Sequence, residues 1–179
     1  SEVGESVNGH LAWLNRLDFK DWVPPAIAFW MAHGEDGERM RCFFADLERL
    51  AYSLLVRREN DNSRISRFGD ITKAIEARAD LWAAGSPLQL SPLEQWSTYQ
   101  VLDGPFYLEV RSPAARKCVL LRLDSLLARG EASYDHPVIS VEHILPQTPQ
   151  PDSEWMTWFP SPELRSHWTH RIGNLALLA

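Results

Sequence analysis

Cysteine is scarce in this sequence, which holds only two among its 179 residues. Cys42 and Cys118 stand far apart and form no Cys-x-x-Cys pair, the spacing that a zinc knuckle needs. Two cysteines are also too few for the disulfide framework of a small secreted domain. The cysteine content therefore argues against a zinc knuckle and against a disulfide-rich secreted domain, and it is typical of proteins in a reducing cytoplasm.

Long hydrophobic runs are absent as well. No stretch approaches the roughly 18 consecutive apolar residues of a membrane-spanning helix, and no signal peptide opens the sequence. We therefore expect a cytoplasmic protein that has no membrane partner.

Positive charge is in short supply, with 18 Lys and Arg against 24 Asp and Glu and a net charge of −6. Proteins that bind nucleic acid usually carry a basic surplus on part of their surface. The basic residues here form small local groups, and each group either contacts phosphate or covers a solvated helix face. For any single group we favour the helix face. The residues in question are Arg57, Arg58, Arg64, Arg67, Arg116, Lys117, Arg122, Arg165 and Arg171.

Helical patterning fills the first 132 residues. Apolar side chains recur at helical spacing in residues 42–58 and 67–82, which predicts two helices that each bury one face. The buried positions expected on the first are Phe43, Leu47, Leu50 and Leu54, and those on the second are Phe68, Ile71, Ile75 and Trp82.

Two further helices are announced by Ser-Pro pairs. Ser91, Pro92 and Glu94 form a capping box, which predicts a helix that begins at Pro92. Ser112 and Pro113 repeat the opening before a helix whose predicted buried stripe is Val119, Leu123, Leu126 and Leu127.

The pattern changes after residue 132. "YDHPVISVEHILPQ", residues 134–147, is the only convincing strand, and "SPELRSHWTHR" predicts a short helix. We predict a mainly α protein, with a helical linker or bundle domain in residues 1–132 and a small α+β domain in residues 133–179. Because the sequence stops at Ala179 inside an apolar run, we expect a piece of a larger protein whose second domain is truncated at its C-terminal end.

His143 is the first candidate for chemistry. In a regular strand it shares a face with Ile139 and Val141, which by itself favours a structural histidine, while Glu142 lies on the opposite face. Phosphodiester hydrolysis needs a base with a pKa near neutral and a cation that neutralises the phosphate. An imidazole beside a carboxylate at a strand end offers both, provided that the strand twists or bulges there. Asn174, which follows the turn at Gly173, either fixes the loop or orients the imidazole.

"VEHILPQ" followed by "HRIGNLALL" resembles the C-terminal HNH (His-Me finger) nuclease domain of the GmrSD-type restriction endonucleases, over about residues 138–178. The family comprises bacterial anti-phage proteins that join this domain to an N-terminal nucleotide-hydrolysing domain. This sequence has no G-x-x-x-x-G-K phosphate loop, so the resemblance places nucleotide hydrolysis in that other domain. It implies a bacterial cytoplasmic enzyme that uses Mg²⁺ or Mn²⁺ to nick or cleave double-stranded DNA.

The resemblance also implies roles for single residues. His143 becomes the general base, Asn174 the orienting asparagine of the HNH signature, and Glu142 a metal ligand. Glu142 is otherwise a supporting group or a solvated acid. The remaining metal ligand of the signature is expected beyond Ala179, and without it the fragment is expected to bind metal poorly.

The other candidates are weaker. His170 and Arg171 either contact a phosphate of the substrate or have a surface or packing role, and Gln147 is expected to bond within its loop. We interpret His136 as a turn residue. Three further histidines have no partner in the sequence and are expected to be structural: His10, His33 and His167.

Two other functions stay open. The net charge of −6 and the missing ligand favour a catalytically inactive helical module that mediates interaction or regulation. Phosphodiester chemistry alone also does not distinguish DNA from RNA, so a nuclease directed at RNA is the second alternative.

Overall fold

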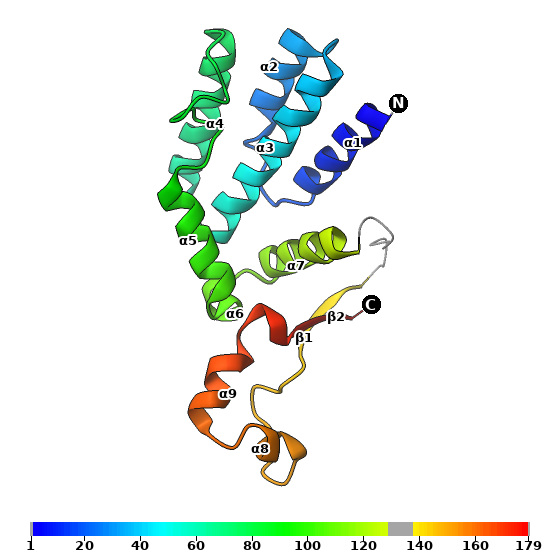
Figure 1. Ribbon diagram of the computed structural model, residues 1–179, viewed down its shortest axis with the longest axis vertical. Helices are drawn as coiled ribbons and strands as arrows, with labels where there is room; N and C mark the ends of the chain where they lie inside the picture. Colours follow the sequence, from blue (N-terminus) through cyan, green and yellow to red (C-terminus); the bar gives the residue numbers. More distant parts are fainter. Residues whose placement is uncertain (1, 129–137, 179) are drawn as a thin grey trace. The chain divides into compact units, whose positions relative to one another are not determined.

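The computed structural model describes residues 2–128 and 138–178. Within them the protein is mainly helical with one small antiparallel sheet, which confirms the predicted fold class (Figure 1). The elements in chain order are α1 Glu2–Asn15, α2 Val23–His33, α3 Gly37–Val56, α4 Asp61–Glu76, α5 Pro92–Asp103, α6 Phe106–Glu109, α7 Pro113–Leu127, β1 Ser140–His143, α8 Glu154–Trp158, α9 Pro162–Thr169, the 3₁₀ turn η1 Ile172–Asn174 and β2 Leu175–Leu178. None of the described helices is long and apolar enough to cross a membrane.

The chain divides into two compact units, Ser1–Thr98 and Tyr99–Ala179. The domain boundary predicted from the sequence, between residues 132 and 133, lies outside the described residues and stays a prediction. The same holds for the turn predicted at His136.

The first unit is a helical bundle in which α1 packs against α3, and α2 packs against α3 and α4. Its core contains two phenylalanine rings, Phe29 and Phe43, stacked with their centroids 3.9 Å apart. The stripe predicted on α3 is confirmed, because Phe43, Leu47, Leu50 and Leu54 are all buried. The capping side chain of α3 is Asp36, which accepts a hydrogen bond from the backbone N–H of Arg39.

The second predicted helix is shorter than its pattern indicated. Phe68, Ile71 and Ile75 are buried as expected, but α4 ends at Glu76 and Trp82 is 38% exposed. Arg78 adopts φ 55°, and the N–H groups of Arg78 and Ala79 bond back to the carbonyls of Ile75 and Ala74. Arg78 in the left-handed conformation and these two hydrogen bonds form the C-terminal cap of the helix. The apolar residues beyond it therefore do not continue the helical face.

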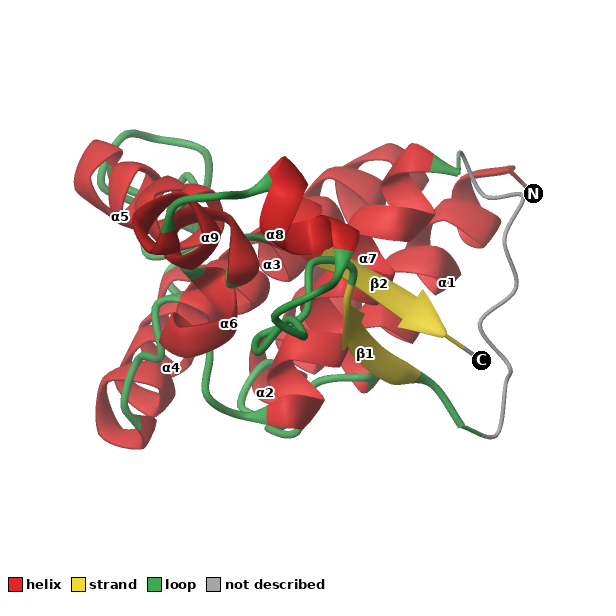
Figure 2. Cartoon of the chain, turned by 90° about the horizontal axis from the view of Figure 1, so that it is seen from below, coloured by secondary structure: helices red, strands yellow, loops and turns green. Residues whose placement is uncertain are grey.

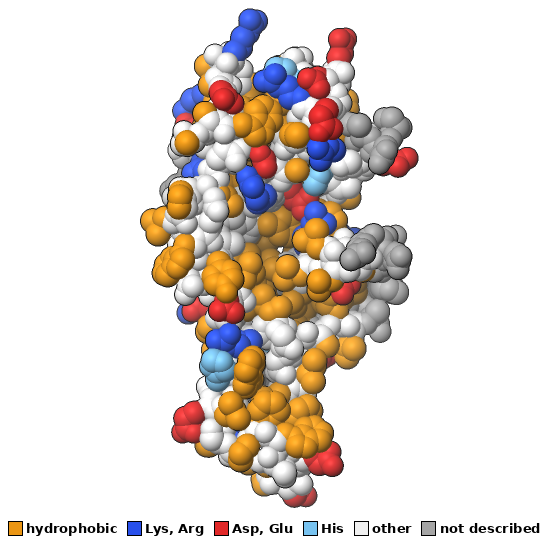
Figure 3. Space-filling model, in the orientation of Figure 1, with side chains coloured by type: hydrophobic (Ala, Val, Ile, Leu, Met, Phe, Trp, Pro, Cys, Tyr) orange, Lys and Arg blue, Asp and Glu red, His pale blue; other side chains and the backbone are white. Residues whose placement is uncertain are grey.

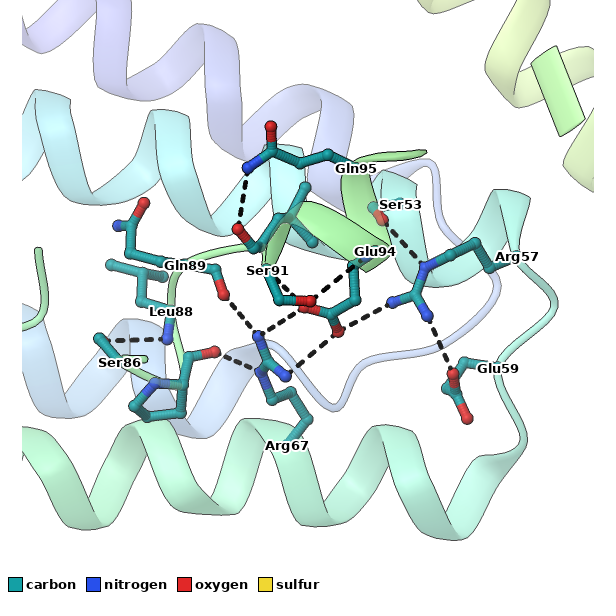
Figure 4. Close-up of polar contacts among 12 residues, drawn as sticks. Ser53, Arg57, Glu59, Arg67, Ser86, Leu88, Gln89, Ser91, Glu94 and Gln95 are labelled. Atoms are coloured by element: carbon teal, nitrogen blue, oxygen red, sulfur yellow. Dashed lines mark hydrogen bonds and ion pairs between the residues drawn. The ribbon is translucent and has the colours of Figure 1, made fainter. Parts of the chain in front are cut away.

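Glu94 is the centre of a polar network in the first unit (Figure 4). The predicted capping box is present: Ser91 Oγ accepts from the Glu94 N–H at 3.2 Å, and Glu94 Oε2 accepts from the Ser91 N–H at 2.8 Å. Glu94 Oε1 also accepts hydrogen bonds from Arg57 and Arg67, each at 3.2 Å. Burial by itself raises the pKa of Glu94, but the hydrogen bonds from Ser91 and the charges of Arg67 and Arg57 together hold that pKa below its usual value.

These contacts decide the role of three of the basic residues. Arg57 and Arg67 pair with Glu94, and Arg64 pairs with Asp21. Their guanidinium groups therefore form ion pairs within the bundle. This role differs from both expectations, a solvated helix face and a phosphate-binding site.

The second unit holds the small sheet, with β1 and β2 lying side by side (Figure 2). The register runs without interruption from Ser140 opposite Leu178 to His143 opposite Leu175. α7 packs against both strands and begins, as predicted, with Ser112 capping the N–H of Ala115. α9 confirms the predicted short helix and begins with Ser161 capping the N–H of Leu164.

Two details of this unit differ from the sequence expectations. α7 buries Cys118, Val119, Leu120 and Leu121 in its middle, whereas the predicted Leu126 and Leu127 are 58% and 83% exposed. Of the predicted strand, residues 134–137 lie outside the described residues, and within 138–147 only Ser140–His143 form β1. Its partner β2 forms from the apolar run that follows Asn174. Hydrophobic side chains also remain exposed over α8 and α9 (Figure 3), including Trp158 and Trp168.

Candidate functional site

The hairpin brings two of the predicted site residues to the same end of the sheet. His143 is the last residue of β1 and lies opposite Leu175, the first residue of β2. Asn174 directly precedes Leu175, so it lies next to the end of β1 although 30 residues separate it from Ile144. Its backbone carbonyl accepts a hydrogen bond from the N–H of Ile144 at 2.9 Å.

The side chain of Asn174 is buried and holds the loop that follows β1. Its Oδ1 accepts from the N–H of Leu145 at 2.7 Å, and its Nδ2 donates to the carbonyls of Leu145 at 3.0 Å and Thr169 at 2.9 Å. Both amide protons are therefore used on backbone carbonyls. Of the two roles expected for Asn174, these contacts are those of a residue that fixes the loop.

The two nitrogens of the His143 imidazole have different surroundings. Nε2 is buried and has no hydrogen-bond partner among the described residues. Nδ1 lies on the exposed side, 3.5 Å from the amide nitrogen of Gln147. A neutral imidazole carries its proton on one nitrogen and accepts at the other. Nδ1 is therefore the ring nitrogen that solvent reaches, and it accepts a proton in the tautomer that carries the ring proton on Nε2.

The pKa of His143 is lowered from its ordinary value of 6.5. Burial of the ring is the largest cause, and the nearby charges of His170 and Arg116 act in the same direction, while Glu142 opposes them. The imidazole is consequently neutral at neutral pH, which is the form that a general base needs.

Tyr107, which no motif in the sequence singled out, contacts both histidines of this site. Its ring centroid lies 4.4 Å from that of His143, at a steep interplanar angle of 69°, and 5.9 Å from that of His170, with the rings nearly parallel. The two imidazole centroids are 5.7 Å apart. Tyr107 comes from the four-residue helix α6, too short to leave a periodic signal in the sequence.

His170 and Arg171 lie where α9 ends. The carbonyl of His170 accepts from the N–H of Tyr107 at 3.0 Å, and its ring Nδ1 is buried without a partner in the described part of the chain. Arg171 pairs with Asp103 at 3.6 Å and lies over the ring of Trp168. Both residues line a groove of about 710 Å³ together with Leu108 of α6.

Glu142 is separated from this group. It is exposed and lies opposite Ala176 in the unbroken register, so its side chain projects from the face of the hairpin opposite to that of His143. The bulge that would bring both side chains to one cation is absent from these four residue pairs.

The described residues do not assemble a metal site on their own. They contain no group of three or more His, Cys, Asp or Glu side chains placed to hold an ion. Glu142 remains available as one exposed carboxylate at the strand end.

Comparison with known proteins agrees with the resemblance in the sequence. Residues 102–179 match the family model for the C-terminal domain of the GmrSD restriction endonucleases, a stretch that contains Tyr107, His143, His170 and Asn174. No curated protein and no solved structure matches the chain. Residues 102–179, somewhat less than half of the chain, are therefore similar to the C-terminal domain of the GmrSD restriction endonucleases, and this match supports a C-terminal region of a GmrSD-type endonuclease.

Proposed function

We propose that this chain carries the catalytic domain of a metal-dependent DNA endonuclease of the HNH type, in which His143 activates water for phosphodiester hydrolysis. The observation that carries the proposal is the state of the His143 ring: one nitrogen is buried and the other faces solvent, and the pKa is lowered. A bacterial anti-phage restriction protein that nicks or cleaves double-stranded DNA is the setting that the family suggests.

In the proposed reaction, Nδ1 of His143 takes a proton from a water molecule as that water attacks phosphorus. The P–O bond to the leaving sugar oxygen breaks, and that oxygen takes a proton from solvent. General-base catalysis of this kind contributes about 10²- to 10⁴-fold to a rate. Asn174 supports the step by fixing the backbone of Leu145, two residues beyond the base. The substrate phosphate is assigned to His170 and Arg171, whose side chains line the groove beside α6.

A divalent cation, Mg²⁺ or Mn²⁺, is the proposed cofactor, because it neutralises charge at the scissile phosphate. Glu142 is the proposed ligand, and its exposed carboxylate suits either ion. Because it lies on the face of the hairpin opposite to His143, sharing one cation with the reacting phosphate requires the end of β1 to twist when the ion binds. We expect Mn²⁺ to bind the full-length protein in calorimetry and Glu142→Gln to weaken that binding. Equal affinity in the two proteins would remove Glu142 from the site.

The main test replaces the base. His143→Ala in the full-length protein is expected to abolish nicking of supercoiled plasmid without lowering the melting temperature. His33→Ala is the matched control, since His33 lies on α2 in the first unit and packs against Phe29. Unchanged nicking by His143→Ala would overturn the assignment.

A non-catalytic interaction module remains the second candidate, favoured by two observations. Arg57, Arg64 and Arg67 are tied into ion pairs inside the bundle, and the described residues form no complete metal site. This candidate expects no binding of Mn²⁺ by the full-length protein. Whether the substrate is RNA is tested by parallel cleavage assays on DNA and RNA of the same sequence.

The remaining proposed partner is the N-terminal nucleotide-hydrolysing domain of the parent protein. It is proposed on the family alone, and loss of nucleotide-dependent cleavage on separating the two domains would support it.

A further inference from the structure

In the part of the chain that the structure describes, His143 lacks the support that usually orients a catalytic imidazole. In most sites one ring nitrogen donates a hydrogen bond to a carbonyl or carboxylate, which fixes both the tautomer and the ring plane. Here Nε2 has no partner among the described residues, and the contact of Nδ1 with Gln147 is long at 3.5 Å. The orientation of the ring must therefore come from the groups that pack against it.

Tyr107 is the aromatic group placed to do this. Its ring meets His143 at a steep angle with the centroids 4.4 Å apart, and it lies nearly parallel to His170. Edge-to-face aromatic pairs at such distances contribute about 0.5–1.5 kcal/mol beyond the area they bury. One side chain thus restrains both imidazoles, and its backbone N–H is itself bonded to the carbonyl of His170.

Arg116 of α7 holds Tyr107 in place. Its guanidinium carbon lies 4.0 Å from the centroid of the Tyr107 ring. Its Nη1 donates to the carbonyls of Tyr107, Val110 and Arg111 at 3.0–3.1 Å. The guanidinium therefore ties the backbone of α6 and the following turn to α7 while it covers the tyrosine ring, so the ring has little freedom to turn away.

We propose that Tyr107, backed by Arg116, is a positioning residue that fixes the ring orientation of His143 and His170. The proposal deepens the proposed function and rests on it for its catalytic consequence. It assigns no proton transfer to Tyr107, so the ring matters and the hydroxyl does not.

The first experiment measures plasmid nicking by the full-length protein. Tyr107→Leu removes the ring, and misplacing the base is expected to lower kcat by about 10- to 100-fold. A smaller rise in the KM for DNA is expected beside it, because His170 is assigned to the substrate phosphate. Tyr107→Phe keeps the ring and is expected to restore wild-type kcat. Tyr99→Leu is the matched control, since Tyr99 is 59% exposed on α5 in the same unit.

The second experiment reads the imidazoles without relying on activity. Histidine labelled with ¹³C gives ring signals for His143 and His170, assigned by their loss in His143→Ala and His170→Ala. These signals are expected to move in Tyr107→Leu, because the ring current of Tyr107 is lost, and to stay in place in Tyr107→Phe. Arg116→Lys provides an independent variant, because lysine keeps the charge but lacks the planar guanidinium group that covers the Tyr107 ring. It is expected to lower kcat by less than Tyr107→Leu does.

The outcomes separate the two claims. Wild-type kcat or unmoved histidine signals in Tyr107→Leu would overturn the positioning role, even if His143→Ala abolishes nicking. Loss of the Tyr107 ring current moves the signals in Tyr107→Leu whether or not the imidazoles turn, so orientation is read from Arg116→Lys, which keeps that ring. If His143→Ala nicks normally while Arg116→Lys moves the signals, the positioning of the imidazoles stands and the nuclease mechanism fails. Should Tyr107→Leu not fold, the same readings on Arg116→Lys and Tyr107→Phe decide the proposal.

Discussion

Asn174 shows how one buried amide determines the geometry of the site. Its side chain bonds to both the N–H and the carbonyl of Leu145 and to the carbonyl of Thr169. These contacts tie the loop after β1 to the end of α9, so the position of His143 depends on a residue about 30 positions away in the sequence. A buried group that loses its partner carries its full desolvation penalty.

Asn174→Ala is therefore expected to lower the free energy of unfolding by about 2–4 kcal/mol. Urea unfolding followed by circular dichroism measures the loss. Asn62→Ala is the matched control, since Asn62 is exposed on α4 and should change stability by less than about 0.5 kcal/mol. Equal effects in the two variants would mean that the three hydrogen bonds contribute nothing.

The lowered pKa of His143 makes a prediction about stability and pH. The unfolded chain binds a proton at His143 near the ordinary pKa of 6.5, and the folded protein binds it only at lower pH. Between the two values the unfolded state holds more protons, so stability falls as the pH is lowered through 6.5 and levels off below the folded pKa. In buffer that contains a metal chelator, the free energy of unfolding of the wild type should fall relative to that of His143→Gln as the pH is lowered from 8 to 5. A gain would contradict the direction of the shift.

At this scale the sequence singled out two residues that the fold brings together, while their catalytic roles stay predictions. The motif identified His143 and Asn174, and the period-two argument correctly placed Glu142 on the opposite face, as the unbroken register shows. Tyr107 had no signal because it reaches the imidazoles from another part of the chain. Local sequence patterns do not predict contacts of this kind between distant segments of the chain.

Among the secondary-structure elements, α5 is the one whose start is best determined. Its capping box was readable from Ser91, Pro92 and Glu94, and the structure adds the ion pairs of Glu94 with Arg57 and Arg67. The side chains of Glu94 and Arg57 are only 18% and 14% exposed, so this pairing is screened less than a surface ion pair.

Glu94→Ala should accordingly lower the free energy of unfolding by about 1–3 kcal/mol. Glu94→Gln keeps the reciprocal cap to Ser91 but loses the charge. Its free energy of unfolding is therefore expected to lie between those of the wild type and Glu94→Ala. Because the pKa of Glu94 is held below its usual 4.5, its contribution is present above that value and is lost as the pH falls through the folded pKa. Thermal melts at pH 7 and pH 3 check this, and a penalty for Glu94→Ala that is equal at both would contradict it.

The elements that the sequence missed share a physical cause. β2 comes from an unbroken apolar run of four residues, Leu175–Leu178, which periodicity cannot tell from a helix segment. α7 buries a compact middle instead of the predicted stripe because both strands pack against that helix. In each case the partner that decides the structure lies elsewhere in the chain.

At the scale of the whole molecule, composition and helical patterning were sufficient for the mainly α fold class. The division into units Ser1–Thr98 and Tyr99–Ala179 depends on contacts between distant residues, which no local pattern encodes. The family match covers residues 102–179, and the candidate site lies within the second unit, where α6, α7, the turn after α9 and the hairpin supply its residues.

The central claim is that His143 is the base of a DNA-cleaving site, and chemical rescue tests it most directly. His143→Gly in the full-length protein should nick plasmid about 10²- to 10⁴-fold more slowly than the wild type. Added imidazole should restore part of that rate, increasingly so as the pH rises through the pKa of free imidazole, while leaving the wild type unchanged. Nicking by His143→Gly at the wild-type rate, with or without imidazole, would contradict the account.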